Sequence, residues 1–524
     1  MPQPQQNMSI EAPGLKGINT EDSPIGGDPY YCEIAENAVF DKFGRLGSRK
    51  GYVIKTSDNT AVGSDTIDRI KEFIAVDGTK VIFSAGNNKL FSGTTTLTDE
   101  TPVGPTITGN DWGMHTLNDD MFFVQPGHDL LIYDHSGGAI VTHTAHPNYG
   151  GTTTLQPDCG LAAYGRMWLA KDSTVYWSDL LIGPDLDNGS SGSLNVTEVW
   201  PNGSDSIVAL AAHNNFLIIF GNESTIVYGS SAYDGNIGDP AADLTLVDTI
   251  TGIGCAGRHT IANIGPDLLF LDKSGLRSFG RVMQQKSMPI GEMSANIRTQ
   301  LRAEVSINAT AGEEPVGLYD SDEGFYLLNL PTVPHIYCFD MRKFLEGNVA
   351  RVTTWTGWSD VVGMTSTQDN TIYIGSNDGI SEYSGYNDGA GYYMFRFYTR
   401  DLDFGDGSRL KFPKQVDWII IDGSGQQATT YWAYDFTKWY KKETFTLNVG
   451  VYDLYNVTGD EYNIDTTVNP DDPTEYYGAG AFSRYQTNIS GHGNYVQIGL
   501  EVKINGYGTS LQNMQVQALT GRIA

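Results

Sequence analysis

The most constraining feature of the sequence is a group of short apolar runs that recurs seven times between residues 73 and 385. Each unit has a run of small residues, a polar turn, a fully apolar run such as FLIIF and, after a second turn, an alternating run such as STIVYGS. Apolar side chains on both faces of a strand indicate a sheet with a neighbour packed at each side. The units recur about 40 to 55 residues apart and occupy residues 73–93, 117–138, 161–179, 207–230, 260–280, 316–340 and 361–385.

This periodicity predicts an all-β fold built around a β-propeller of six or seven blades, spanning residues 66–388. Turns rich in Gly, Asn and Asp separate the runs, and these residues suit hairpins because they tolerate positive φ. One helix is predicted at 289–303. Pro289 opens that segment, and apolar residues such as Ile297 and Leu301 follow at helical spacing.

The pattern differs at the two ends of the chain. Residues 389–524 contain longer alternating runs with long polar loops between them, which predicts an antiparallel β-sandwich or jelly-roll domain. Residues 1–65 show no regular pattern, so we expect an irregular N-terminal segment that wraps or completes the propeller.

The charge of the chain limits its partners. It has 33 Lys and Arg against 62 Asp and Glu, a net charge of −29, which argues against a surface that grips nucleic acid through clustered cations. Four widely spaced cysteines without a CxxC pair argue against a zinc site or a disulfide framework. The sequence starts with no signal-peptide pattern and holds no apolar stretch of 18 residues, so no membrane-spanning segment is expected.

The candidate chemical motifs lack the neighbouring residues or elements that their chemistry requires. The GIGCAG run at 252–257 matches G-x-G-x-x-G, but two apolar β-type runs follow it, where a dinucleotide site needs a helix. His143 and His146 lie in a Thr, Pro and Gly loop without a patterned acidic partner. No nucleophile elbow or phosphate-binding loop occurs. We therefore expect no cofactor, no bound metal and no enzymatic activity.

The opening of the chain carries the most specific signal. In the segment GLKGINTEDSPIGGDPYYCEIAENAVFDKFGRLGSRKGYVI, five residues match a family pattern: Asn37, Asp41, Gly44, Arg49 and Gly51. The segment resembles the N-terminus of the tail nozzle proteins of short-tailed bacteriophages, also called hub, tail tubular protein B or packaged-DNA stabilisation proteins. Runs such as NNFLIIFGNESTIVYGS and the terminal sandwich pattern are similar to that family as well.

The resemblance implies a structural protein of the virion tail, assembled in the host cytoplasm. Its partners would be further copies of itself in a ring, usually of six, and the adaptor ring of the head-tail connector. Tail fibres or tailspikes would be seated on its outer face. Genomic double-stranded DNA would be retained, and then conducted during ejection, through a central channel without tight binding.

Two expectations accompany this interpretation. Acidic loops of the sandwich should be exposed or border the channel, where like charge prevents DNA from adsorbing; they contain Asp460, Glu461, Asp465, Asp471, Asp472 and Glu475. The alternative function is a glycan-binding or glycan-cleaving propeller with a sandwich module. It depends on the many carboxylates, two of which at the right separation would suffice for cleavage, and on aromatic residues forming a sugar-stacking surface, with candidates Trp168, Trp177, Trp355, Trp358, Trp418, Trp432 and Trp439.

Overall fold

The chain divides into two compact units, of which the first is assembled from three stretches of sequence. It comprises Met1–Val53, Arg351–Gly357 and Ser384–Ala524, and the second comprises Ile54–Ala350 and Trp358–Tyr383. The computed structural model describes residues 5–11, 14–23, 25, 27–63, 65–107, 111–143, 155–187, 189–231, 237–284, 292–358, 361–448 and 482–521.

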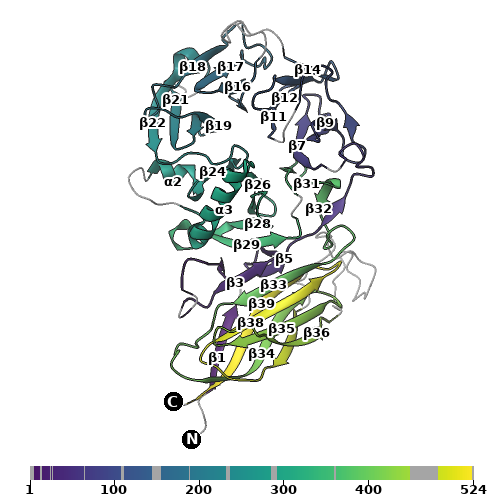
Figure 1. Ribbon diagram of the computed structural model, residues 1–524, viewed down its shortest axis with the longest axis vertical. Helices are drawn as coiled ribbons and strands as arrows, with labels where there is room; N and C mark the ends of the chain where they lie inside the picture. Colours follow the sequence, from purple (N-terminus) through teal and green to yellow (C-terminus); the bar gives the residue numbers. More distant parts are fainter. Residues whose placement is uncertain are drawn as a thin grey trace, which may run out of the picture. The chain divides into compact units, whose positions relative to one another are not determined.

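The second unit is a β-propeller, as predicted, with seven sheets around one axis within the described residues (Figure 1). The first four sheets each consist of four consecutive antiparallel strands. They are β7 (Ile67–Ile74), β8 (Lys80–Gly86), β9 (Lys89–Ser92) and β10 (Thr98–Asp99); β11 (Gly113–Leu117), β12 (Asp120–Val124), β13 (Leu131–Asp134) and β14 (Ala139–Thr142); β15 (Cys159–Ala163), β16 (Arg166–Lys171), β17 (Thr174–Trp177) and β18 (Gly192–Asn195); and β19 (Ile207–His213), β20 (Phe216–Gly221), β21 (Ser224–Ser230) and β22 (Leu244–Thr251).

In the described part of the chain, the fifth and sixth blades have three strands each, and the seventh has four. The strands of the fifth, sixth and seventh are β23 (Ala262–Asn263), β24 (Leu268–Asp272) and β25 (Gly275–Ser278); β26 (Val316–Asp320), β27 (Phe325–Asn329) and β28 (His335–Phe344); and β30 (Met364–Ser366), β31 (Ile372–Ser376) and β32 (Gly379–Tyr383). The short strand β6 (Tyr52–Ile54), at whose end the second unit begins, is the fourth strand of the seventh sheet. The chain then continues along this sheet, where the N–H groups of Lys55 and Thr56 donate to the Ile380 carbonyl.

Burial on both faces explains why seven sheets stack in this way. Every residue of β24 and β27 is buried, and β20 is buried beyond its first residue. The faces of neighbouring sheets share apolar clusters: Phe83 of the first sheet packs with Phe123 of the second, and Phe220 of the fourth with Phe270 of the fifth. Each interface removes two apolar faces from water at once, which is the dominant favourable contribution to folding.

The predicted helix exists, but its bounds differ from 289–303. The main helix α3 spans Arg298–Ala311, after a 3₁₀ turn at Ala295–Ile297, and residues 285–291 lie outside the described part of the chain. Ile297 and Leu301 are buried, as their spacing predicted. The helix continues beyond 303 because the following residues tolerate helical geometry until Gly312, whose φ of 75° ends it. The shorter helices are α1 (Pro240–Asp243), α2 (Phe279–Gln284) and the 3₁₀ turn Glu346–Asn348.

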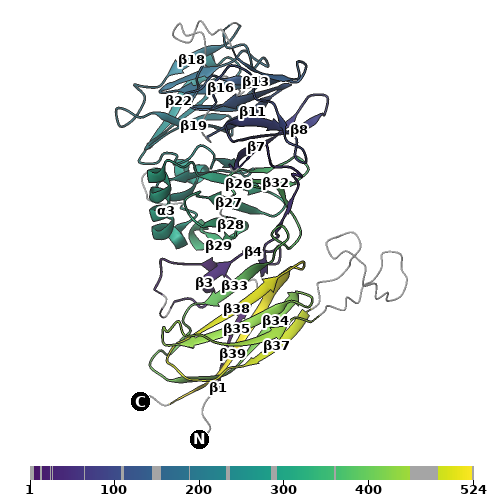
Figure 2. The same ribbon diagram turned by 45° about the vertical axis from the view of Figure 1, so that its right-hand side comes forward.

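The first unit is a β-sandwich. The prediction of an irregular segment over 1–65 is wrong for the five short strands that this segment adds to the sandwich, whereas its sixth strand, β6, pairs within the seventh sheet of the propeller. One sheet has the order β37-β34-β39-β5-β4, with β1 also paired to β39, and the other contains β29-β2-β3-β33-β38-β35-β36 (Figure 2). Their bounds are β1 (Gln5–Glu11), β2 (Gly17–Ile18), β3 (Tyr31–Glu36), β4 (Ala38–Phe40), β5 (Leu46–Ser48), β29 (Ala350–Thr356), β33 (Tyr393–Thr399), β34 (Lys411–Asp422), β35 (Gln427–Tyr434), β36 (Lys441–Thr446), β37 (Phe482–Asn488), β38 (Val496–Ile504) and β39 (Thr509–Thr520).

The two sheets of the sandwich meet at a buried tryptophan. Trp418 on β34 donates from Nε1 to Thr430 Oγ1 on β35 at 2.9 Å and packs edge-on against Phe397 of β33. Pairing between these strands is antiparallel except among β2, β3 and β29, which pair with one another in parallel. The propeller is therefore an insertion within the sandwich sequence, since strands on both sides of it build the same two sheets.

Candidate functional site

Arg49, one of the five residues that match the family pattern, joins the three stretches of the first unit. Its side chain is completely buried, and its two terminal nitrogens lie 2.8 and 2.7 Å from the two Asp388 carboxylate oxygens. It also donates to the Thr356 carbonyl at 3.1 Å, and its guanidinium lies 4.2 Å from the centre of the Tyr393 ring. Bidentate pairing fixes both distance and angle, which a lysine cannot reproduce.

Asn37 completes this arrangement. Its Oδ1 accepts from Arg49 Nε and from the Thr356 backbone N–H, both at 2.9 Å. Its Nδ2 donates to Thr356 Oγ1 at 3.0 Å and to the Met394 carbonyl at 2.8 Å. The residue has a φ of 54°, a conformation that asparagine tolerates better than most side chains. An amide is needed here because the same group must both donate and accept.

The other three pattern residues shape the backbone around this pair. Asp41 Oδ1 accepts from the N–H groups of Phe43 and Arg45, closing the turn between β4 and β5, and Gly44 within that turn has a φ of 77°. A Cβ on Gly51 would lie 1.9 Å from the Asn387 carbonyl oxygen, so only glycine fits there. All five residues therefore have a structural reason within the sandwich, and we call Asn37, Arg49, Thr356 and Asp388 the sandwich lock.

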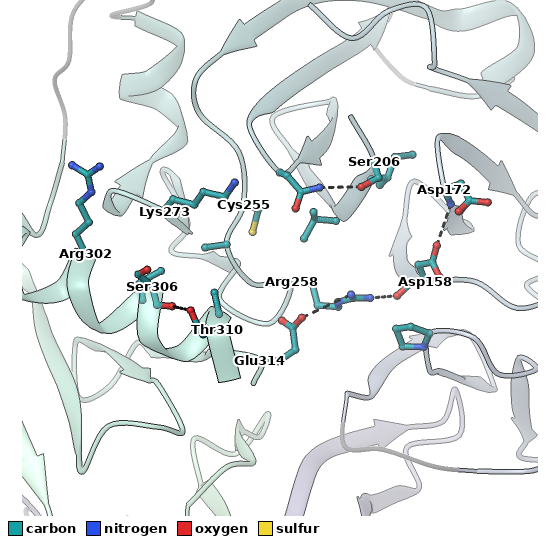
Figure 3. A pocket seen from close by; sticks show the side chains of 17 residues that line it. Asp158, Asp172, Ser206, Cys255, Arg258, Lys273, Arg302, Ser306, Thr310 and Glu314 are labelled. Carbon is teal, nitrogen blue, oxygen red and sulfur yellow. Dashed lines mark hydrogen bonds and ion pairs between the residues drawn. The ribbon is translucent and has the colours of Figure 1, made fainter. Parts of the chain in front are cut away.

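A second candidate site is a polar cavity of about 820 Å³ inside the propeller unit. Its wall includes Asp158, Arg258 and Glu314, together with one face of α3 that presents Arg302 and Ser306 (Figure 3). Arg258 also lines a smaller cavity of about 380 Å³, so it lies where the two adjoin. Both volumes are typical of small-molecule pockets.

An ion-pair cluster surrounds Arg258. One guanidinium nitrogen lies 3.4 Å from Asp111 and 3.9 Å from Glu314, and another donates to the Asp158 carbonyl. His259 Nε2 lies 2.7 Å from the other Asp111 oxygen. Burial, with a further contribution from Asp111, raises the pKa of Glu314 to about 7. These side chains hold one another in place through ion pairs and hydrogen bonds. None of them is arranged as a nucleophile beside a general base.

The glycan alternative requires exposed aromatic rings, and only one of its seven candidate tryptophans is exposed. Six of the seven tryptophans are buried: Trp168, Trp177, Trp355, Trp358, Trp418 and Trp432. Trp439 is the exception, with 89% of its surface exposed. A stacking platform needs exposed rings, so the idea that these tryptophans form a shared platform is wrong.

The remaining sequence candidates have structural explanations or lie outside the described residues. Residues 252–257 form a glycine turn between β22 and β23, with the Cys255 N–H donating to the Gly221 carbonyl. His143 Nε2 lies 2.6 Å from the Pro184 carbonyl oxygen. No group of three or more His, Cys, Asp or Glu side chains is placed to hold a metal ion in the described ranges. The positions that fall outside them are His146 and the acidic set Asp460, Glu461, Asp465, Asp471, Asp472 and Glu475.

Sequence reasoning missed the charged residues of the propeller cavities. The signal was available in the run IDRIKEFI, because it places Arg69 and Lys71 in the first strand of a blade. First strands contact one another from blade to blade around the axis, so charges at alternate positions there face a shared interior.

Comparison with known proteins gives likeness of fold only. No family model and no curated protein matches the chain. Similar solved structures include BamB from Moraxella catarrhalis, at 12% identity and a TM-score of 0.37 over 72% of this chain and 96% of that one. The WD40 β-propeller domain of Doa1 is 8% identical, with a TM-score of 0.35 over 64% of this chain and 96% of that one. The extracellular domain of BT4673 from B. thetaiotaomicron is 11% identical, with a TM-score of 0.37; the match covers 76% of this chain but only 45% of that domain.

These identities and TM-scores are too low to carry an argument. The fold class, a β-propeller with a β-sandwich, is therefore assigned from the sheets of the chain itself. Within the described residues, no helix is long and apolar enough to cross a bilayer.

Proposed function

We propose that the protein is a structural component of a phage virion, the tail nozzle of a short-tailed phage. In this role it forms a ring, of six copies in the family it resembles, below the adaptor ring, helps to retain packaged DNA, and forms part of the ejection channel. Its outer face would seat fibres or spikes. We propose no enzymatic activity for it.

The observation that carries this proposal is the sandwich lock. The pattern residues that resemble the nozzle family are those whose side chains and backbone hold the three stretches of the sandwich together, through Arg49 and Asp388 above all. A motif whose residues hold the sandwich together fits a protein that must resist mechanical load, because buried bidentate ion pairs are costly to break. The motif therefore supports a structural role more than a chemical one.

The size of the propeller cavities bears on where DNA would pass. Cavities of about 820 and 380 Å³ are suited to small molecules, and the Arg258 cluster occupies the place where they adjoin. A duplex therefore would not run through a single propeller. We propose that the channel is formed between copies of the chain, by contacts that close under rotation.

The glycan alternative retains one exposed tryptophan, Trp439, between β35 and β36. A single exposed ring supports weak contact with many partners and does not by itself select a sugar. A glycan array with analysis of released sugars tests this alternative directly. Binding or cleavage abolished by Trp439→Ala would favour it over the nozzle.

Electron microscopy of the purified chain, alone and with the adaptor of its own phage, tests the nozzle proposal. Rings that stack on the adaptor are the expected result. Particles that remain monomeric in both samples, at concentrations where adaptor rings are intact, would contradict it.

A further inference from the structure

The smaller cavity of the propeller has a strongly one-sided charge. It has a volume of about 380 Å³ and is lined by residues of the first strands β7, β11, β23, β26 and β30. Five basic side chains and no acidic one line it: Arg69, Lys71, His115, Arg258 and His259. In a chain of net charge −29, such a concentration of cations is a local property of this wall.

Two of these cations form no ion pair with any described residue, although Asp111 and Glu314 act on the charge of Arg69 from farther away. Among the described residues, no carboxylate lies within ion-pair distance of Lys71 or Arg69, whose only hydrogen bond runs from Nε to the Trp112 carbonyl at 3.0 Å. Burial lowers the pKa of Lys71, and the charge of Arg69 adds to the effect. The Lys71 side chain is exposed to solvent. Two like charges held close together without an ion-paired carboxylate repel each other, and a bound anion would relieve that repulsion.

The nearby acids are already engaged. Asp111 contacts both Arg258 and His259, and Glu314 lies near Arg258 on the side of the larger cavity. Arg69 and Lys71 occupy alternate positions of β7 and so share a face of that strand. The unpaired positive charge is therefore directed into the smaller cavity.

His115 adds a neutral donor to the same wall. Burial, with the charges of Lys71 and Arg69, lowers its pKa to about 3, so the imidazole is uncharged near neutral pH. Its ring is accommodated by two glycines: a Cβ on Gly113 would lie 3.1 Å from His115 Nε2, and one on Gly160 would lie 3.1 Å from Cδ2. A neutral imidazole can donate one hydrogen bond to an anion without adding to the repulsion.

We propose that this cavity, which we call the axial anion site, binds a small molecule bearing a phosphate group, held by Lys71, Arg69 and His115. A guanidinium fork and an ammonium are the usual recognition groups for phosphate oxygens, and the volume suits an ion or a compact phosphomonoester. A cavity of about 380 Å³, lined by the first strands of five blades, is too small for duplex DNA. The proposal is independent of the role in the virion.

Titration of the full chain with inorganic phosphate, in phosphate-free buffer of low ionic strength, tests the site by calorimetry. We expect one site per chain with Kd below about 1 mM. Lys71→Met should weaken binding by roughly tenfold or more, since it removes a charge-assisted contact. Lys343→Met is the matched control, because Lys343 is an exposed lysine on β28 of the same unit, and it should leave Kd within about twofold.

A second variant guards against a folding defect in the first. Asn263 also lines the cavity, and its Oδ1 accepts from the Gly265 N–H at 2.9 Å, an interaction that aspartate keeps. Asn263→Asp therefore adds a negative charge with little change of shape and should also weaken phosphate binding. In the absence of phosphate, Lys71→Met should raise Tm, because the unpaired ammonium is gone.

The outcomes separate clearly. Tighter binding of adenosine monophosphate than of inorganic phosphate would assign the site to a phosphomonoester, and the reverse would assign it to the free ion; both support the site. Equal affinities of wild type, Lys71→Met and Asn263→Asp would mean an adventitious ion only and would overturn the proposal. Competition by a duplex oligonucleotide would overturn the restriction to small ligands.

Discussion

Replacing Arg49 by methionine should selectively destabilise the sandwich. The substitution keeps much of the length of the side chain but removes the cation that faces the two oxygens of Asp388, whose side chain is only 13% exposed. Breaking a buried ion pair from one side costs about 3–5 kcal/mol, because the remaining charge stays desolvated. The Asn37 Oδ1 and the Thr356 carbonyl each lose a donor in addition.

This loss is large relative to the stability of a domain, which is about 5–15 kcal/mol. Hydrogen exchange measured by mass spectrometry is the appropriate assay, because a chain of two units does not unfold in a single two-state step. We expect faster exchange in residues 37–50, 354–356 and 388–396. Blades two to four should keep their protection.

A double-mutant cycle isolates the pair. Asp388→Asn in the Arg49→Met background should recover part of the loss, with a coupling of about 1.5–3 kcal/mol, because it removes the uncompensated carboxylate. Arg409→Met is the control: Arg409 pairs with Asp406 at the surface, where side chains are 43% and 36% exposed, so the change should cost less than about 1 kcal/mol. An Arg49→Met effect no larger than this control would refute the role assigned to the lock.

Three further predictions concern stability. Burial raises the pKa of Asp68 to about 7, so the folded chain keeps a proton that the unfolded chain loses above about pH 4. The stability of the fold therefore decreases as the pH rises from about 4 to about 7. Asp68→Asn should raise Tm at pH 8 and make Tm less dependent on pH between pH 5 and 8. Gly51→Ala should destabilise the sandwich by at least about 2 kcal/mol, measured by hydrogen exchange of residues 37–50, whereas Gly391→Ala, whose nearest neighbour is at 3.4 Å, should change its stability by less than about 0.5 kcal/mol. Trp418→Ala should cost about 3–5 kcal/mol in the same assay, and Trp439→Ala, whose side chain is 89% exposed, should leave the exchange rates unchanged.

The blades could be predicted because their signal is local. β20 and β27 contain the apolar runs FLIIF and FYLL, and burial on both faces follows from stacking of neighbouring sheets. The sandwich strands of the N-terminus could not be predicted in this way. β2, β4 and β5 are two or three residues long, and the backbone partner of Gly17 is Val352, more than 300 positions away.

In the candidate sites, too, the local residues could be predicted from the sequence and their distant partners could not. The pattern around Asn37 and Arg49 was visible in the sequence, but its purpose depends on Asp388 and Thr356, which only the fold brings to it. Lys71 was visible as one of four charged residues in β7, yet only the fold shows that no carboxylate of the described residues lies within ion-pair distance of it.

The structure narrows the conclusion that can be drawn from the net charge of −29. That charge excludes a surface that grips DNA, while the axial anion site shows that cations can still be concentrated locally within the propeller. Where the excess acid lies relative to a channel between copies depends on the assembled ring.

Cryo-electron microscopy of the chain bound to its adaptor tests the central proposal most directly. We expect a closed ring of six copies, with a bore between the copies wide enough for a DNA duplex and not strongly basic. A ring whose only openings are the axes of the individual propellers would contradict the nozzle proposal. So would a complex in which single chains bind the adaptor without contacting one another.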